Sequence, residues 1–236
     1  MSKQICDNLK AVKKRIASAC EKADRNPDEI TLVAVSKTKP IADIRTAFEC
    51  GQVHFGENRA RELQDKMDEL EEDQIRWHMV GNLQTNKIKY MVNRVDWIDS
   101  VPKKKTIREI EKRASRIERV INILIQVNIS GEEQKSGCEP EDLGKILEYT
   151  RGKDHVHVRG LMGMATYLDE DEDLETIRPE FRLLRELRDE HRSYNGGNIQ
   201  LDHLSMGMTN DLEIAIQEGS TMVRVGRAIF GERDYG

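Results

Sequence analysis

A lysine follows the first β-branched run of the chain, and its position is suggestive of covalent chemistry. The run reads Val33-Ala34-Val35-Ser36-Lys37. Because side chains alternate across a strand, Val33, Val35 and Lys37 share one face. If that face lines the interior of the fold, Lys37 is desolvated, and a desolvated lysine offers a neutral amine that attacks carbonyl carbons to form a Schiff base. The alternative is that Lys37 and Lys39 end a strand in solvent.

Two glycine-containing segments near the C-terminus have the composition of a phosphate site. Glycine allows backbone N–H groups to approach an anion, and a serine hydroxyl adds a further donor. The predicted contacts are Ser205, Met206, Gly207, Gly226 and Arg227. His203 shares a strand face with Ser205 and is expected to line the same cavity. Glycine is common at strand ends, so this prediction depends on a fold that joins the two segments.

Arg224 and Asn58 are the remaining candidates for the site. Arg224 has the same strand parity as Gly226 and is expected to point inward, where an unpaired guanidinium is costly to bury. Its partner is either a pyridine nitrogen or a carboxylate from a neighbouring strand. Asn58 follows the second predicted strand and can hydrogen-bond a ring substituent, or else simply cap a helix.

Other polar residues are interpreted structurally. His78 lies within a predicted strand and is treated as a core residue, and His155 and His157 have no third ligand at metal spacing, so no metal is predicted. The acidic run 169–173 is interpreted as a solvated loop. The cysteines are widely separated and are interpreted as reduced thiols in the cytosol; they are Cys6, Cys20, Cys50 and Cys138.

The elements that position these residues alternate between short β-branched runs and longer amphipathic, charged runs. Predicted strands are 30–36, 52–55, 76–80, 95–98, 121–129, 156–162, 199–204 and 222–229. Alternation of this kind predicts one (β/α)8 barrel domain over residues 1–236, with active groups at the carboxyl ends of its strands. An open doubly wound sheet is the second possibility. An extra helix is predicted at 3–23, before the first strand.

Three helices can be placed in more detail. The first has apolar spacing over 41–48 and a stop signal at Gly51. Another begins at Asn210 with Glu213 three residues on, and ends at Gly219. The span 173–192 has one apolar helical face, and Pro179 marks either a kink or the true helix start.

Composition excludes several classes of function. A chain of 236 residues with a formal charge of −5 lacks the basic balance of a nucleic-acid-binding protein. Its first residues do not form a signal peptide, and no stretch approaches the roughly 18 apolar residues of a membrane span. We therefore expect a cytoplasmic protein that binds neither nucleic acid nor membrane.

At these residues the sequence resembles the pyridoxal phosphate homeostasis protein family from end to end. The resemblance is carried by Val33-Ala34-Val35-Ser36-Lys37-Thr38-Lys39-Pro40, Phe55-Gly56-Glu57-Asn58, the stretches 77–87, 126–130 and 135–137, Leu204-Ser205-Met206-Gly207-Met208, and the stretches 219–226 and 229–231. Departures are confined to Asn210-Asp211 and Asn82.

The resemblance implies a barrel similar to the N-terminal domain of alanine racemase, carrying pyridoxal 5'-phosphate (PLP) as an aldimine on Lys37. It implies that Arg224 faces the pyridine nitrogen, that Ser205 and the backbone of Gly226 and Arg227 hold the phosphate, and that Asn58 lies near the ring. The implied function is PLP homeostasis by a monomer that releases the cofactor to apoenzymes.

Two enzymatic alternatives remain open. An amino-acid racemase needs a second, opposed base, which we expect to be missing because the chain ends at Gly236 soon after the eighth strand. A guanidinium opposite the pyridine nitrogen also weakens the ring as an electron sink, although weak racemisation is compatible with this site. A Schiff-base aldolase that uses Lys37 without a cofactor needs a neighbouring acid or base that the sequence does not nominate.

Overall fold

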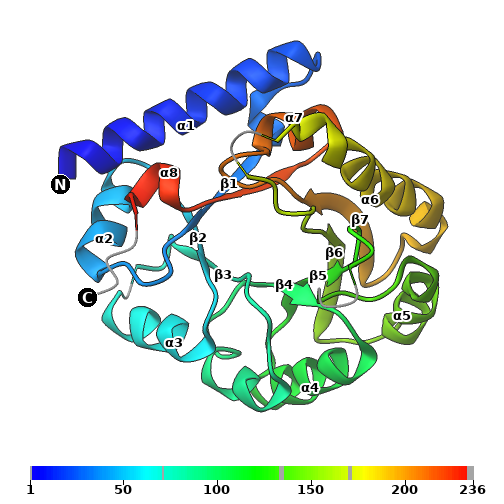
Figure 1. Ribbon diagram of the computed structural model, residues 1–236. Coiled ribbons are helices and arrows are strands. Elements are labelled where there is room, and N and C mark those ends of the chain that lie inside the picture. The colour runs from blue at the N-terminus through cyan, green and yellow to red at the C-terminus, as the bar shows by residue number, and fades with distance from the viewer. Residues whose placement is uncertain (1, 71, 133–135, 170–171, 233–236) are drawn as a thin grey trace.

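The computed structural model describes residues 2–70, 72–132, 136–169 and 172–232, and its centre is a closed parallel barrel in the order β1 to β8 (Figure 1). The closed barrel confirms the predicted (β/α)8 fold over the open sheet. The strands are β1 (Thr31–Val35), β2 (His54–Glu57), β3 (Arg76–Met79), β4 (Trp97–Val101), β5 (Ile121–Gln126), β6 (Val156–Met162), β7 (Ile199–Ser205) and β8 (Met222–Val225).

Helices surround the barrel (Figure 1); α2 to α7 each lie between two successive strands, β3 and β4 are joined through a 3-10 turn, and α8 follows the last strand. They are α2 (Ile41–Glu49), α3 (Ala60–Glu69), α4 (Lys104–Ala114), α5 (Leu143–Thr150), α6 (Arg178–Glu190), α7 (Leu212–Gln217) and α8 (Arg227–Phe230). Short 3-10 turns are η1 (Pro27–Glu29), η2 (Thr85–Tyr90), η3 (Ser115–Ile117), η4 (Pro140–Asp142), η5 (Leu174–Ile177) and η6 (His191–Tyr194).

The predicted extra helix is present as α1 (Ser2–Lys22), which lies outside the ring against α2, α7 and α8 (Figure 1). One face of α1 is buried through residues such as Leu9 and Val12. Arg15 ties the helix to α7 through a 2.7 Å ion pair with Glu213. The helix therefore covers the part of the barrel where the first and last strands meet.

Several strand limits differ from the prediction, and local structure accounts for two of the differences, at β8 and β2. β8 ends at Val225 rather than continuing to residue 229, because Gly226 leaves the extended conformation and α8 begins there. β2 begins two residues later than predicted, since Gln52 uses its side chain to donate to the carbonyls of Leu32 and His54, both at 2.7 Å. β4 also begins later, at Trp97, and β5 stops at Gln126.

The helix predicted to begin at Asn210 instead begins at Leu212 after Asp211, and no side chain caps its first turn. Asp211 accepts a hydrogen bond from the Met208 amide at 2.5 Å, so the carboxylate closes the preceding loop rather than the helix. Pro179 occupies the first turn of α6, which makes it a helix start rather than a kink. Gly51 and Gly219 follow their helices with positive φ, as stop signals do.

The prediction that all four cysteines are reduced thiols is wrong for two of them. Cys6 of α1 and Cys50, directly after α2, form a disulfide with their Cα atoms 5.7 Å apart. Cys20 and Cys138 are free and buried. The pairing joins residues 44 positions apart in sequence and depends on how α1 packs against α2, which spacing alone does not reveal.

Apolar packing lies between the barrel wall and the helices, whereas the barrel interior contains many polar residues. Outward-facing strand residues such as Ala34, Phe55 and Ile98 are fully buried in the main apolar cluster. Buried polar side chains include His78, Asp99 and Arg224. No helix among the described residues is long and apolar enough to cross a membrane.

Candidate functional site

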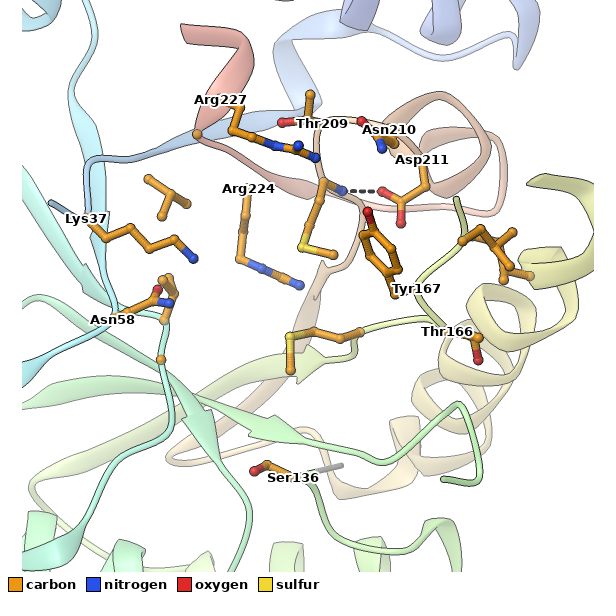
Figure 2. Close-up of a pocket in the computed structure, with 18 of the residues that line it drawn as sticks. Lys37, Asn58, Ser136, Thr166, Tyr167, Thr209, Asn210, Asp211, Arg224 and Arg227 are labelled. Atoms are coloured by element: carbon orange, nitrogen blue, oxygen red, sulfur yellow. Dashed lines mark hydrogen bonds between the residues drawn. The ribbon is translucent and has the colours of Figure 1, made fainter. Parts of the chain in front are cut away.

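A cavity of about 560 Å³ opens at the carboxyl ends of the strands (Figure 2). This volume lies in the range of roughly 300 to 1,000 Å³ that is typical of small-molecule sites. Its wall is built from residues that follow β1, β2, β3, β6, β7 and β8, together with residues of β5 and η5. The barrel thus brings five of the predicted site residues to one place, as the rule for this fold predicts: Lys37, Asn58, Arg224, Gly226 and Arg227.

Lys37 and Asn58 form one side of the cavity. Figure 2 shows the Lys37 side chain extending into the cavity beside Asn58 and toward Arg224. Lys37 is half-buried, and the residue after it, Thr38, has a φ of +65° that turns the chain sharply after β1. The amine therefore lies within the cavity and not in bulk solvent beyond the strand.

Arg224 forms the floor of the cavity and is almost completely buried. Its Nη1 donates to the carbonyl oxygen of Ser205 at 2.8 Å and to the Ser205 hydroxyl at 2.7 Å, and its Nη2 donates to the carbonyl oxygen of Gly163 at 3.1 Å. None of the described residues accepts a hydrogen bond from Nε. A guanidinium has five N–H donors, so this buried cation keeps donor capacity for a ligand.

The electrostatic surroundings of Arg224 bear on the two partners that the sequence left open. Burial lowers the pKa of the Arg224 guanidinium, and the negative charges of Asp99 and Asp211 act against that effect. Neither carboxylate hydrogen-bonds the guanidinium; backbone carbonyls and the Ser205 hydroxyl hold it instead. Asp99 lies on β4, which does not pair with β8, and Asp211 directly precedes α7, so neither is the neighbouring-strand carboxylate that the sequence offered as a partner.

Gly226 and Arg227 line the cavity, as predicted for a phosphate site. The Cα of Gly226 lies close to β1, and a Cβ at this position would be 3.1 Å from the carbonyl oxygen of Val35. A glycine is thus favoured where the backbone passes the cavity wall. The other part of the predicted cradle is displaced along the loop: the residues that reach the cavity are Met208, Thr209, Asn210 and Asp211.

Ser205, Met206 and Gly207 do not line the cavity. Ser205 and Met206 are fully buried, and the Ser205 hydroxyl accepts its hydrogen bond from Arg224. Gly207 has a φ of +93°, and a Cβ there would be 2.6 Å from the Cβ of Ala215. These residues lie behind the cavity wall and hold Arg224 and the loop in place.

His203 is also outside the cavity lining. It lies on the edge of the Trp97 ring, with 5.4 Å between ring centroids, and its Nδ1 is 3.5 Å from the Thr221 hydroxyl. Trp97 stacks on His78, whose Nδ1 is 3.1 Å from Asp99 and whose Nε2 is 3.0 Å from Nδ1 of His54. His203 thus belongs to a polar cluster in the barrel interior, and His78 is a fully buried residue of that cluster.

Two of these groups have perturbed ionisation because of burial. Burial lowers the pKa of His54 to about 4, with the adjacent His78 contributing in the same direction. Burial also lowers the pKa of His203. Both imidazoles are therefore expected to be neutral near pH 7.

Within the described ranges, no group of three or more His, Cys, Asp or Glu residues could hold a metal ion.

Sequence reasoning missed Asp211 and the loop before it as part of the site. Asp211 is buried, its carboxylate accepts a hydrogen bond from the Met208 amide, and burial raises the pKa of the carboxyl.

The acidic run 169–173 lies only partly within the described ranges, because residues 170 and 171 fall outside them. Within the run, the carboxylate of Asp173 caps η5 by accepting a hydrogen bond from the Glu175 amide at 2.9 Å.

Comparison with known proteins adds a family to this geometry. A family model described as "Alanine racemase, N-terminal domain" matches residues 8–234. The pyridoxal phosphate homeostasis protein of Aquifex aeolicus is 46% identical over 231 residues, which cover 98% of this chain and 99% of that protein. The protein of the same name from Escherichia coli K12 is 36% identical, covering 98% and 97% of the two chains. The chain belongs to the pyridoxal phosphate homeostasis protein family.

Solved structures agree with this membership. A structure of PipY from Synechococcus elongatus with PLP bound is 31% identical, has a TM-score of 0.81, and matches 97% of this chain and 100% of its own. An alanine racemase from Corynebacterium glutamicum has a TM-score of 0.75 at 12% identity. The match covers 100% of this chain and 62% of the racemase chain. That lower likeness shows a common barrel fold.

Proposed function

We propose that this member of the family binds PLP in the cavity and functions in PLP homeostasis, without robust catalytic turnover. The observation that carries the proposal is that one cavity is lined by Lys37, by Arg224, and by Gly226 and Arg227, and that none of the described residues accepts a hydrogen bond from the Nε of Arg224. PLP supplies an aldehyde, an aromatic ring nitrogen and a phosphate, so each of these groups has a counterpart in the cavity wall.

The residues divide the task among them. Lys37 would hold the cofactor through its aldehyde, Arg224 would donate to the ring nitrogen, and Asn58 would lie near the ring. The phosphate would be held at Gly226 and Arg227 and at the loop of Met208 to Asn210, which lines the cavity in place of Ser205. Ser205 would act indirectly, because its carbonyl and hydroxyl oxygens accept hydrogen bonds from Nη1 of Arg224 and so hold the guanidinium in place.

A reversible covalent bond to Lys37 suits a protein that stores a reactive aldehyde and releases it. When PLP is bound, it would supply a reversible carbon–nitrogen bond to Lys37, and an incoming amine could exchange with Lys37, whose free amine would be restored. Relatives at 36% to 46% identity are named for PLP homeostasis, which supports this role. We expect the acceptors to be apoenzymes that need PLP.

Arg224 argues against efficient amino-acid chemistry as the main role. A guanidinium is always protonated, so it donates to the ring nitrogen and leaves that nitrogen without a proton of its own. An unprotonated ring is a weaker electron sink for carbanions at the amino acid. Racemase assays with a panel of amino acids are expected to give no turnover beyond a trace, and turnover of several per second for any of them would reject this part of the proposal.

The binding proposal is tested by spectroscopy on the purified protein. After incubation with PLP, the wild type should show a visible absorbance band that is lost on borohydride treatment, and tryptic mapping should place the reduced adduct on Lys37. Lys37→Ala should show no band. Lys39→Ala is the control. The Nζ of this nearby lysine donates a hydrogen bond to the carbonyl oxygen of Glu232 at 2.6 Å, so its replacement should leave the band unchanged. A colourless wild type, or an adduct on Lys39, would overturn the proposal.

A further inference from the structure

The two residues that flank Lys37 are held from outside the barrel by side chains of α3. The Nζ of Lys66 donates to the carbonyl oxygen of Ser36 at 2.8 Å. Glu62 accepts a hydrogen bond from the amide of Thr38 at 2.5 Å. The backbone on either side of Lys37 is therefore fixed by two charged residues that lie one helical turn apart on the same helix.

These contacts belong to one buried network. The ammonium of Lys66 also donates to Glu57 at 2.7 Å and to Glu62 at 2.8 Å, so its three N–H donors each have an acceptor. The Ser36 hydroxyl donates to the same Glu57 oxygen at 2.6 Å. Exposed fractions are 7% for the Lys66 side chain and zero for Glu57. The network lies between α3 and the ends of β1 and β2.

The backbone of Thr38 shows that this arrangement constrains the chain. Its φ of +65° is a left-handed conformation that is unfavourable for a β-branched residue, by about 1 to 2 kcal/mol. The hydrogen bond from its amide to Glu62 supports that conformation. The turn follows directly after Lys37, whose side chain extends into the cavity (Figure 2).

Burying charged groups in this network is unfavourable in free energy, which is unexpected if the network only supports the fold. One oxygen of Glu57, Oε2, is buried and has no hydrogen-bond partner. Burial raises the pKa of Glu57 to about 7. Apolar residues of similar volume would fill such a space at no such cost, since buried ion pairs are on average no more stabilising than good apolar packing. A role in placing the neighbouring lysine accounts for keeping charged groups here.

We propose that Glu62 and Lys66 are positioning residues for Lys37, and that they set the rate at which its amine condenses with the cofactor aldehyde. This rests on the proposed function. In the step concerned, the neutral Nζ would attack the aldehyde carbon, a C=N bond would replace the C=O bond, and the oxygen would leave with the two amine protons as one water molecule. The positioning residues do not touch the cofactor; they hold the backbone that aims the amine.

The test uses three variants of the full-length protein. Glu62→Ala removes the acceptor for the Thr38 amide, whereas Glu62→Gln retains a carbonyl oxygen that can still accept it. Glu109→Ala is a matched control on α4: Glu109 has 23% side-chain exposure against 22% for Glu62, and each pairs with a cation four residues on. Rates of appearance of the visible band are measured by stopped flow after mixing apo protein with PLP.

Misplacing a reacting group by about 1 Å can cost up to roughly a hundredfold in rate, so we expect Glu62→Ala to be slower than wild type by about tenfold or more. Glu62→Gln should stay within about threefold of wild type, because the hydrogen bond survives, and Glu109→Ala should match wild type. Equal rates for Glu62→Ala and wild type would overturn the proposal.

A second measurement separates positioning from general damage to the fold. In a Lys37→Ala background, the affinity for PLP is measured by fluorescence with and without Glu62→Ala. If Glu62 acts through Lys37, the added substitution changes that affinity by less than about twofold, because the side chain through which Glu62 acts is already absent. A large loss of affinity would mean that Glu62→Ala damages the cavity itself, and would overturn the positioning role. A wild type that forms no band rejects the proposed function instead.

Discussion

Neighbouring residues at the ends of β1 and β2 lie on opposite sides of the barrel wall, and the two sides are built differently. Ser36 and Glu57 face outward, are fully buried, and share hydrogen bonds with Lys66. Lys37 and Asn58 face inward onto a cavity. The alternation of a strand thus separates a group that fixes the backbone from a group that is available to a ligand.

The comparison predicts that outward-facing substitutions change stability, whereas inward-facing substitutions change ligand binding. Each face contains a lysine: Lys66 donates to three acceptors within a buried network, and Lys37 lines the cavity. Substitutions on the two faces should therefore separate when unfolding free energy and equilibrium affinity for PLP, rather than the rate of its condensation, are measured on the same set of proteins.

The largest expected effect is on stability, from Lys66→Met. Removing one partner of a buried ion pair leaves Glu57 as an uncompensated buried carboxylate, which typically costs about 3 to 5 kcal/mol of unfolding free energy. Urea denaturation at pH 8 measures the loss. The loss should shrink at pH 5, where Glu57 is protonated, because burial already raises its pKa to about 7.

A double variant provides the control for that experiment. Lys66→Met combined with Glu57→Gln removes both charges, so it should recover much of the stability that the single substitution loses. A single variant as stable as wild type at pH 8 would mean that the outward face does not support the structure through charge, and the contrast between the faces would fail.

The second effect is the pH dependence of stability that Glu57 contributes. Its pKa rises from the usual 4.5 to about 7 on folding, so the folded state binds more protons between these values. Stability from this group is therefore present at low pH and is lost as the pH rises from about 4.5 to 7, by roughly 3 kcal/mol for a shift of this size. Glu57→Gln should remove this slope.

The measurement is urea denaturation at half-unit steps between pH 4.5 and 8, for wild type and Glu57→Gln. His54 contributes the opposite slope, because its pKa falls to about 4 and the unfolded state binds more protons below 6.5. The difference in unfolding free energy between wild type and Glu57→Gln reports on Glu57 alone, because His54 contributes equally to both proteins. A difference that does not change with pH would show that Glu57 ionises normally in the folded state.

The sequence predicted the barrel and the inward face well, and the reason is geometric. Eight β-branched runs separated by amphipathic runs specify parallel βα units, and the carboxyl ends of the strands must then meet. Strand parity placed Lys37 and Arg224 on the inward face, and both line the cavity. Local pattern is sufficient for such residues because each depends on one strand and on closure of the barrel.

Strand alternation was not sufficient to place His203. It predicts which face of the strand a side chain lies on, but not which layer of the barrel interior the side chain occupies. His203 precedes Ser205 by two residues, which corresponds to about 6.6 Å along a strand, so the two occupy different layers of the interior. Ser205 itself is covered by Arg224, which follows it by 19 residues. Contacts of this kind, like the disulfide between Cys6 and Cys50, arise from tertiary packing that sequence spacing does not encode.

On the inward face, Gly226→Ala is expected to have the third largest effect. A Cβ would meet the carbonyl oxygen of Val35 at 3.1 Å, so the backbone that would cradle the phosphate must shift by a few tenths of an ångström. We expect PLP affinity to fall by about tenfold, or 1.4 kcal/mol, measured by fluorescence titration. Pyridoxal, which lacks the phosphate, serves as the control ligand and should lose much less affinity. Equal losses for both ligands would place the phosphate elsewhere.

The smallest expected effect is also the sharpest comparison, since Asn58 is adjacent to Glu57 but on the other face. None of the described residues hydrogen-bonds the Asn58 side chain, and it lines the cavity. Asn58→Ala should therefore leave unfolding free energy within about 0.5 kcal/mol of wild type while weakening PLP binding about threefold through one lost polar contact. Glu57→Gln should do the reverse: change the pH profile of stability and leave PLP affinity nearly intact. If both substitutions change the same property, the barrel wall does not separate support from binding at this point.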